Sequence, residues 1–418
     1  MDGGAELPED LIYIILSKLP PCRTEHWAVS CLNQRWNSAV KSLFENHIQP
    51  PSIIFPSSCM PLFHSTASCH WNEKNLSESD LDSLNCNWKS LYLPKDVRVH
   101  GRLSGSSEGG WFVLALDQED EVTYQLFNIN TRRMDSLPGT VKSMEGICTN
   151  FHLEAAVISS SPLQPGYMVA AIGKDGSSVA VRRYSMEYWE EVPCRTISDD
   201  GDCLVDLIYY QSQFWFLTAG ERIGKLVEQK DENGNLVTCW VEINTRERGS
   251  YLSDTDITEK QNCKTKRYLV ESEGDLYMVI KVLAETGAVI TIKVFRLDLN
   301  DADEDRDEYG SSSDSSELHC DRMYFTWEDA AAQFPDRNFF VGQASSRSFP
   351  TSSTPRIYFL DDGCTKNPTN PDFYMRDQMG FVPVSEVLDY EVPEPWPLLG
   401  SPCPDCSSDR APPSWWIH

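Results

Sequence analysis

The N-terminal end of the chain carries the strongest helical pattern in the sequence. Apolar residues fill six successive positions, 11–16, directly after Pro8, Glu9 and Asp10. Proline is tolerated in a first helical turn because its missing N–H would have no partner there, and the helix dipole favours acidic side chains at that end. The pattern predicts a helix that ends before Pro20. A helix that is apolar on every side must be covered on every side.

A second segment, residues 27–43, repeats its apolar positions at helical spacing and is the only local cover for this helix. Two or three short helices are too few to build a self-sufficient core. The remaining apolar surface is therefore closed either by another molecule or by the rest of the chain, on which the helices would form a docked cap. The apolar pattern by itself is compatible with both.

From residue 49 onward the pattern changes to short apolar runs separated by turn residues. Residues 173–176, Gly-Lys-Asp-Gly, form a typical hairpin turn between two such runs. Many short antiparallel strands over most of the chain favour a β-propeller over a single sandwich. Strands are expected at residues 52–56, 88–94, 110–116, 122–129, 167–172, 178–184, 204–210, 214–218, 237–243, 267–271, 276–283, 289–297, 339–341, 357–360 and 380–384.

One tetrapeptide occurs twice. Ile-Asn-Thr-Arg stands at residues 129–132 and again at 243–246, each time at the end of an expected strand. The repetition supports repeated structural units, whereas the irregular spacing between strand pairs argues against a regular WD or kelch array. The predicted fold class is mainly β with a small α-helical N-terminal module, the β part being an irregular, kelch-like propeller.

Composition excludes several classes of protein. A hydrophobic content of 40% indicates a substantial folded core, and no apolar run approaches the ~20 residues of a membrane span. The net charge of -27 argues against broad electrostatic binding to nucleic acid or to anionic membranes. The N-terminus lacks the pattern of a signal peptide, so the 14 scattered cysteines are expected to be reduced thiols in the cytoplasm or the nucleus.

No catalytic motif is present in the sequence. It contains no Gly-x-Ser-x-Gly elbow, no phosphate-binding loop and no His-Glu-x-x-His. The glycine-rich residues 101–110 lack the Lys-Ser/Thr pair of a nucleotide site and are interpreted as a flexible turn before a strand. The tryptophans on or beside expected strands are interpreted as blade core rather than as a ligand platform: Trp111, Trp189, Trp215, Trp240 and Trp327.

Two segments invite a metal hypothesis, and neither meets its requirements. Cys403 and Cys406 have the spacing of half a zinc site, but the sequence offers no second pair close by. Residues 301–312 begin like a calcium loop and then place Arg306 and Ser312 where Gly and Glu are required. Nine acidic residues and one arginine within 298–317 predict instead a solvated, disordered insert between strands.

The helical module resembles an F-box. Residues 7–20 read Leu-Pro-x-Asp-Leu-Ile-x-x-Ile-Leu-Ser-x-Leu-Pro, and residues 29–31 and 36–40 resemble the second half of that motif, although the connector at 22–26 departs from it. The resemblance implies binding to the Skp adaptor of Skp–cullin–F-box ubiquitin ligases. It assigns the following residues to the adaptor interface, the last three of which, with Trp27, also brace the F-box core: Leu7, Pro8, Leu11, Ile12, Ile15, Leu16, Leu19, Pro20, Val29, Cys31 and Trp36.

The β part resembles a second family. The landmarks lie at residues 105–111, 127–128, 137–138, 267–272, 293–298, 336–342, 357–359 and 412–416. They resemble the plant F-box proteins whose C-terminal part is a KIB-type β-propeller, also catalogued as domain of unknown function 295. The chain is accordingly expected to consist of an F-box at 1–46, a propeller at 50–395 with the acidic insert at about 299–317, and a proline-rich tail at 396–418 that docks its terminal tryptophans onto the propeller.

These resemblances imply a substrate receptor with no catalytic centre of its own. The F-box would bind the Skp adaptor and through it the cullin, while the propeller would hold a target protein for ubiquitylation. No cofactor, metal, nucleic acid or membrane is expected as a partner. Two alternatives stay open: an F-box protein that works outside a ligase as a scaffold, and an enzyme built on a propeller.

Overall fold

The computed structural model of this protein describes most of residues 101–359. Within that span the gaps are 108, 119–120, 129–130, 175, 185, 195–201, 231–235, 246–263, 285–288, 301–323, 331–333, 335 and 351–354. Beyond it, the structure describes residues 11, 12, 15, 36, 38, 52–55, 62–65, 89–90, 364–367, 370–376, 380–383, 396–397 and 414–416.

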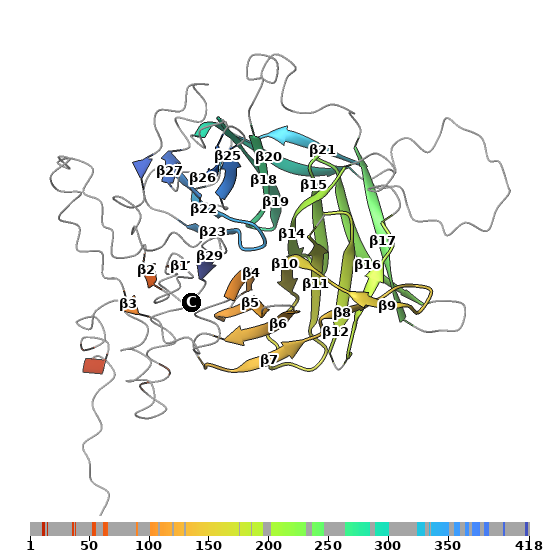
Figure 1. Ribbon diagram of the computed structural model, residues 1–418. Coiled ribbons are helices and arrows are strands. Elements are labelled where there is room, and N and C mark those ends of the chain that lie inside the picture. Colours follow the sequence, from red (N-terminus) through yellow and green to blue (C-terminus); the bar gives the residue numbers. More distant parts are fainter. Residues whose placement is uncertain are drawn as a thin grey trace, which may run out of the picture.

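The described strands form five blades around a common centre (Figure 1). In the first four blades, each strand pairs antiparallel with the next one along the chain. Their strands are β4 (Gly101–Ser107), β5 (Trp111–Gln118), β6 (Glu121–Asn128) and β7 (Met134–Leu137); β10 (Leu153–Ile158), β11 (Met168–Gly173), β12 (Val179–Arg183) and β13 (Trp189–Val192); β14 (Leu204–Tyr210), β15 (Gln213–Thr218), β16 (Ile223–Lys230) and β17 (Leu236–Thr245); β18 (Lys264–Ser272), β19 (Asp275–Leu283), β20 (Val289–Asn300) and β21 (Tyr324–Asp329).

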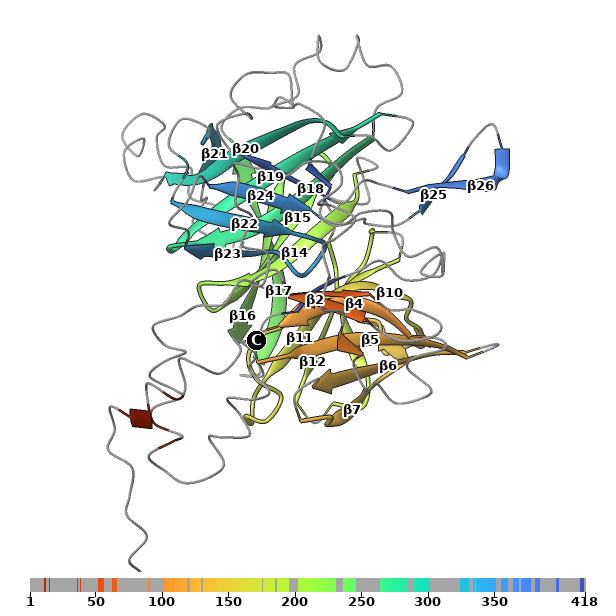
Figure 2. The same ribbon diagram turned by 90° about the vertical axis from the view of Figure 1, so that its left-hand side faces the viewer.

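The fifth blade is irregular. Its second and third strands run parallel, and a hairpin inserted after them projects from the body in Figure 2. The blade contains β23 (Arg347–Pro350), β22 (Arg337–Val341), β24 (Arg356–Phe359), β27 (Gly380–Pro383) and β28 (Trp396–Pro397), and the inserted hairpin β25 (Cys364–Asn367) and β26 (Asn370–Arg376).

Two further parallel pairings extend the blades. The hairpin of β8 (Thr140–Lys142) and β9 (Cys148–Asn150) adds to the second blade because β8 pairs with β13, which leaves β9 at the edge of a six-stranded sheet. The outermost strands of the third and fourth blades, β17 and β21, also pair parallel and join those blades into one sheet.

The C-terminal strand and the start of the β part meet in one small sheet. In this sheet β29 (Ser414–Trp416) pairs with β1 (Ser52–Phe55), which pairs with β2 (Leu62–Ser65) and through it with β3 (Lys89–Ser90). The backbone of residues 414–416 therefore supplies a strand beside the first strand of the β part. In Figure 1 this sheet lies beside the first blade.

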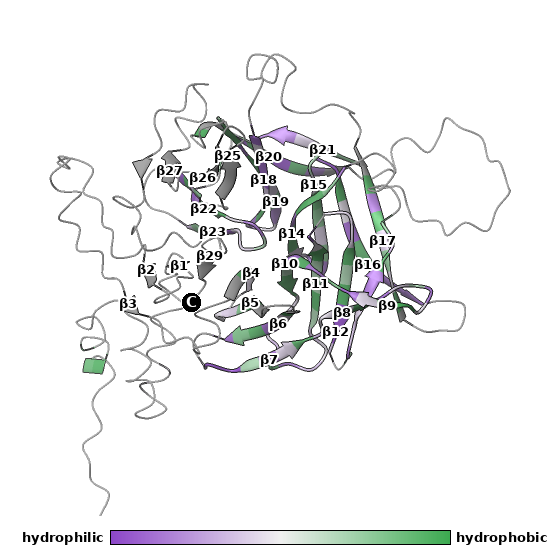
Figure 3. Cartoon of the chain, viewed as in Figure 1, coloured by the Kyte–Doolittle hydropathy of each residue, from purple (hydrophilic) through white to green (hydrophobic). Residues whose placement is uncertain are grey.

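The hydrophobic core lies between neighbouring blades. Four clusters of buried side chains fill the spaces between the first and second, second and third, third and fourth, and fourth and fifth blades. In β10, for example, Ala155 and Val157 face the third blade, whereas Ala156 and Ile158 face the first. Figure 3 shows the resulting apolar residues along β10, β11, β14 and β15. Both faces of the second, third and fourth blades are covered in this way, and inner strands such as β11 and β15 are nearly continuous apolar runs.

The structure confirms the prediction that the tryptophans on or beside strands belong to the core of the blades. Trp111, Trp189, Trp215 and Trp327 are no more than 3% exposed. Trp240 is half-buried and covers Gly224 of the neighbouring strand so closely that a Cβ there would come within 1.9 Å of its ring. The aromatic residues of this sequence therefore stabilise the contacts between strands and between blades.

The prediction of a flexible turn at residues 101–110 is wrong. Residues 101–107 form β4, which pairs with β5 over its whole length. Gly105 is needed here because β10 passes so close that a Cβ would lie 1.9 Å from the carbonyl oxygen of Ala156. What looked like a flexible glycine-rich segment is a strand that packs tightly against the next blade.

The repeated tetrapeptide does not mark equivalent positions in two blades. Its first copy follows β6, the third strand of its blade, whereas the second begins in β17, the fourth strand of its blade. The side chain of Asn128 explains the first copy, since its Oδ1 accepts hydrogen bonds from the backbone N and from Oγ1 of Thr131 at 2.8 and 3.0 Å. The shared residues reflect local turn chemistry rather than repetition of a blade.

The acidic insert connects two paired strands. Asn300 at the end of β20 lies opposite Tyr324 at the start of β21, and the residues between them, 301–323, lie outside the described part of the chain. A connection of this kind can be shortened without separating the strands that it joins, because the cost of closing a loop changes only slowly with its length.

Deletion of residues 301–316 should therefore leave the stability of the propeller almost unchanged. We expect the midpoint of thermal unfolding to shift by less than about 2 °C, since solvated like charges bury little apolar surface. Differential scanning calorimetry of the full chain and of the deletion variant measures this shift. A decrease of more than about 4 °C would show that the insert packs against the blades or binds an ion.

Candidate functional site

The first candidate site is the N-terminal helical module. The backbone is helical at Leu11, Ile12 and Ile15, and the three side chains differ sharply in exposure. Ile12 is 1% exposed, whereas Leu11 and Ile15 are 45% and 40% exposed. Residues four positions apart lie on the same face of a helix, so Leu11 and Ile15 present one apolar face while Ile12 points away from it.

Trp36 is also helical and is half-buried. The other residues expected at the adaptor interface lie outside the described residues: Leu7, Pro8, Leu16, Leu19, Pro20, Val29 and Cys31. Among the described apolar residues of this module, Ile12 is buried, Trp36 is half-buried, and Leu11 and Ile15 are exposed.

The second candidate site is the propeller, whose blades are tied together by buried polar groups. Asp206 in β14 is 1% exposed, and its two carboxylate oxygens accept hydrogen bonds of 2.7 Å from the backbone N of Leu269 and of Ala344. One side chain of the third blade thus holds both the fourth and the fifth blade. Hydrogen bonds to a buried charged group are among the stronger ones in proteins.

The turn between β22 and β23 extends these ties across the ring. Besides its bond to Asp206, Ala344 accepts a hydrogen bond of 3.2 Å from the backbone N of Ser106 in the first blade. The side chain of Gln343 donates to the carbonyl oxygen of Val205 at 3.2 Å. Residues 342–346 consequently connect the first, third and fifth blades, and the propeller is a rigid platform on which loops and edges keep their relative positions.

A buried ion pair joins the third and fourth blades. Glu221 lies in the turn between β15 and β16, and its Oε1 accepts hydrogen bonds of 3.2 and 2.9 Å from Nε and Nη2 of Arg267 in β18. The two side chains are 3% and 9% exposed. The backbone oxygen of Glu221 also accepts a bond of 3.0 Å from the indole of Trp327. Removal of either charged partner would leave the other buried without its opposite charge.

Asp202 is the carboxylate for which the structure predicts a clear dependence of stability on pH. Burial raises its pKa, but hydrogen bonds from Thr218, Gly220, Arg222 and Cys203 outweigh this effect, so that the pKa lies below its usual value. The guanidinium of Arg222 donates to Oδ2 at 3.0 Å. A carboxyl group whose pKa is lowered by folding stabilises the folded state above the pKa that it has in the unfolded chain, and this contribution is lost as the pH falls through the folded-state pKa.

The variant Asp202→Asn should be less stable than the parent at pH 7, by on the order of 1 kcal/mol, because an amide cannot accept at both of its terminal atoms. The difference should begin to shrink as the pH falls below the ordinary aspartate pKa of about 4, because the carboxylate is then protonated in the unfolded chain, and it should disappear once the pH passes the lower pKa of the folded state. Urea unfolding of both proteins between pH 3 and 7 measures the difference in their free energies of unfolding. Asp135→Asn is the control, since the ion pair of Asp135 with Arg133 is partly exposed to solvent. A difference in stability between the parent and Asp202→Asn that stays constant with pH would show that folding does not lower the pKa of Asp202.

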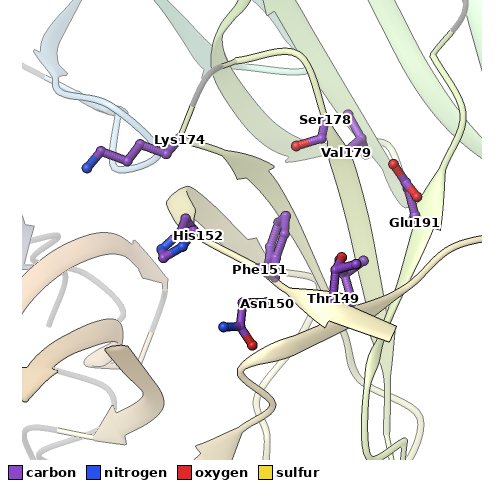
Figure 4. Close-up of a pocket in the computed structure, with 9 residues that line it drawn as sticks. Thr149, Asn150, Phe151, His152, Lys174, Ser178, Val179 and Glu191 are labelled. Atoms are coloured by element: carbon purple, nitrogen blue, oxygen red, sulfur yellow. The ribbon is translucent and has the colours of Figure 1, made fainter. Parts of the chain in front are cut away.

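A third feature is an open pocket of about 520 Å³ at one end of the second blade, beside the turn between β11 and β12. Figure 4 shows its lining, with Lys174 and His152 toward one end and Glu191 toward the other. The ring of Phe151 lies between them and packs at 5.6 Å from Trp189. The remaining lining residues are Val141, Thr149, Asn150, Ser178 and Val179.

The described residues offer little chemistry of other kinds. No group of three or more His, Cys, Asp or Glu side chains among them is arranged to hold a metal ion. The cysteines whose side chains are described, at 148, 194, 203 and 239, are free thiols. Burial and the charge of Glu191 raise the pKa of the Cys194 thiol to about 12, so it stays protonated and is not a nucleophile. A helix with the length and apolarity of a membrane span does not occur in the described part of the chain.

Comparisons with solved structures give only weak similarities. One is YCF48 bound to a D1 peptide, with 12% identity over 55% of this chain and 56% of that chain and a TM-score of 0.24. Another is Hsv2p of Kluyveromyces lactis, with 10% identity over 66% of this chain and 81% of that chain and a TM-score of 0.28. The chain thus covers little more than half of the first structure, and scores this low carry no argument about function. A comparison with curated proteins found no match.

Comparison with protein-family models gives two matches. Residues 5–47 match the F-box domain, and residues 81–382 match the KIB1-4 beta-propeller. The first match contains the helical residues Leu11, Ile12 and Ile15, and the second contains all strands of the first four blades. Because the propeller match spans well over half of the chain, this protein belongs to the KIB1-4 β-propeller family and carries an F-box in front of its propeller.

Proposed function

We propose that this protein is the substrate-recognition subunit of a Skp–cullin–F-box ubiquitin ligase. The observation that carries the proposal is the presence in one chain of an F-box at residues 5–47 and of a propeller at residues 81–382. The first part would bind the Skp adaptor and through it the cullin, and the second would bind a target protein. The chain itself would perform no chemical step.

The exposed face of the F-box helix supports the adaptor half of this proposal. Leu11 and Ile15 leave an apolar pair in water, which is unfavourable unless a partner covers it. Contact with the adaptor would bury these side chains without disturbing the packing of Ile12. The complete set of proposed contacts is the one that the F-box resemblance assigns, from Leu7 to Trp36.

The rigidity of the propeller supports the receptor half. A ligase accelerates ubiquitin transfer by holding a lysine of the target near the loaded conjugating enzyme, so its contribution is proximity and orientation. The hydrogen bonds of Asp206 and the ion pair of Glu221 with Arg267 fix the blades relative to each other. A target bound to any blade would therefore keep a defined position relative to the rest of the propeller.

Reconstituted ubiquitylation tests the proposal against the alternative of a scaffold that works outside a ligase. Proximity labelling with the full chain and with a variant lacking residues 1–46 first sorts the partners: those lost on deletion belong to the ligase, and those retained are candidate targets. A retained partner is then incubated with purified adaptor, cullin, conjugating enzyme and either form of the chain. Ubiquitylation that depends on residues 1–46 is expected. Binding of the partner without any ubiquitylation would favour the scaffold.

A further inference from the structure

An open sheet edge lies beside the pocket of the second blade. The hairpin of β8 and β9 with the adjoining pocket is here called the β9 surface and consists of residues 140–152, Lys174, Ser178, Val179 and Glu191. β9 is the last strand of its six-stranded sheet, and its three residues are all exposed. None of them is charged and none is proline, the residues that commonly protect a sheet edge.

The hydrogen-bonding pattern shows which backbone groups of β9 are open. Thr149 lies opposite Val141, and the flanking bonds run from Ser143 N to Ile147 O and from Phe151 N to Gly139 O. In an antiparallel pair every second residue faces its partner strand. The backbone groups of Thr149, like those of Ile147 and Phe151 on either side of the strand, thus face β8. The backbone N–H and C=O groups of Cys148 and Asn150 point toward the open edge.

Apolar side chains stand at the tip of the same hairpin. Met144 is 79% exposed and Ile147 is 57% exposed, and they are the two most exposed large apolar residues among those described. Methionine adapts its shape readily and is common on surfaces that bind extended peptides and helices. The tip therefore offers apolar contact area next to an edge that can accept a strand.

The polar side chains of the pocket have no hydrogen-bond or ion-pair partner among the described residues. Thr149, Asn150, His152, Lys174, Ser178 and Glu191 line it, and in the described part of the chain none of these side chains forms a hydrogen bond or an ion pair with another residue. Lys174 is exposed although the chain has a net charge of -27 and acidic residues are abundant. Lys174 stands at one end of the pocket with His152 beside it, and the oppositely charged Glu191 stands at the other end (Figure 4).

We propose that the β9 surface receives an extended segment of the target protein as an additional strand. Backbone groups of the segment would pair with Cys148 and Asn150, an apolar side chain would cover Met144 and Ile147, and an acidic side chain would reach Lys174 and His152. A basic side chain on the same segment would match Glu191. Backbone pairing gives such complexes affinity, and side-chain pockets give them specificity. This inference rests on the proposed function, since it names the place where a target binds.

Selection from a displayed library of random peptides of about ten residues, with the full-length protein as bait, tests the inference. The selected peptides are synthesised with a fluorescent label, and their affinity is measured by anisotropy. We expect them to share apolar residues at alternate positions and one acidic residue. Capture of purified Skp adaptor by the same protein samples is measured in parallel, so that failure of peptide binding and failure of the adaptor assignment are read separately.

Three variants locate the binding site. Asn150→Pro removes an N–H that β8 does not use, and Ile147→Ser removes apolar contact area at the tip; each should weaken binding about tenfold. Lys174→Glu should weaken it as well, and exchange of the acidic residue of the peptide for lysine should restore binding to this variant alone. Matched controls are Leu163→Ser, at a residue that is 55% exposed, and Lys230→Glu, at an exposed lysine of β16. Both should bind the peptides as the parent does.

Unfolding midpoints of all variants show whether a loss of binding reflects loss of structure. Should Asn150→Pro unfold, Lys174→Glu with the charge-exchanged peptide still decides, because Lys174 is exposed and forms no ion pair with another described residue. The inference is overturned if the library yields no binding peptide, if the selected peptides bind the β9-surface variants as tightly as the parent, or if the controls weaken binding to the same extent.

Discussion

Aspartate at both positions 11 and 15 should abolish binding of the Skp adaptor. Leu11 and Ile15 are exposed on one face of the F-box helix, so neither substitution creates a buried charge within the free protein. In a complex, however, each carboxylate would lie in an apolar interface without a partner, which costs several kcal/mol. At ~1.4 kcal/mol per tenfold in affinity, a loss of about 3 kcal/mol already weakens the complex roughly 100-fold. Biolayer interferometry with purified adaptor on immobilised full-length protein measures this loss.

Two comparisons make the result specific. Leu163→Asp places the same charge at a similarly exposed apolar residue of the propeller and should leave adaptor binding unchanged. Ile12→Asp buries a charge inside the module and should also abolish binding, but with loss of helical signal in circular dichroism, which the double variant should retain. If the double variant binds the adaptor as tightly as the parent, the proposed interface is wrong.

Removal of residues 411–418 should destabilise the whole propeller. The deletion eliminates β29, whose residues Ser414, Trp415 and Trp416 pair with Ile54, Ile53 and Ser52 of β1. This pairing ties the C-terminal strand to the first strand of the β part, and its loss would leave the edge of β1 unpaired. We expect the midpoint of thermal unfolding to fall by at least about 5 °C and the variant to aggregate on heating.

Replacement of residues 403–409 by a glycine-serine linker of equal length is the control for this deletion. It alters the chain between β28 and β29 while keeping β29 itself, so its unfolding midpoint should stay close to that of the parent. Calorimetry and light scattering of the three proteins separate the outcomes. Equal midpoints for the deletion variant and the parent would show that the pairing of β29 with β1 contributes nothing to stability.

The sequence predicts about half of the described strands, chiefly apolar strands that lie within the blades. Apolar runs such as residues 276–283 and 289–297 are recognisable without a partner strand, and they correspond to β19 and β20. The Gly-Lys-Asp-Gly turn likewise correctly joins β11 to β12. Turn chemistry and continuous apolar runs are local properties, and they can be recognised in a single sequence.

The elements that the sequence does not reveal depend on distant contacts. Residues 101–107 contain two glycines and three serines, and they form a strand because β5 pairs with them and β10 packs on Gly105. The turn at residues 342–346 resembles an ordinary surface turn in the sequence. Its role follows only from bonds to Ser106 and Asp206, which lie more than a hundred positions away in the chain.

The sequence also does not reveal which side chains of the F-box helix face a partner. The apolar run at residues 11–16 predicts a helix that needs cover on every side, but it does not tell which side chains face the module and which face a partner. The structure separates Ile12 from Leu11 and Ile15 by their exposure. The β9 surface carries no motif at all, because its open edge arises from the parallel pairing of β8 with β13, which only the folded sheet creates.

Direct binding between the full-length protein and purified Skp adaptor decides whether this chain is a ligase subunit. The two are mixed and separated by size-exclusion chromatography with light scattering, which reports the mass of each species. We expect a single complex with one adaptor per chain, and no such complex when residues 1–46 are deleted from an otherwise folded propeller. Separate elution of the wild-type protein and the adaptor would show that the chain does not bind the adaptor and that the proposed function is wrong.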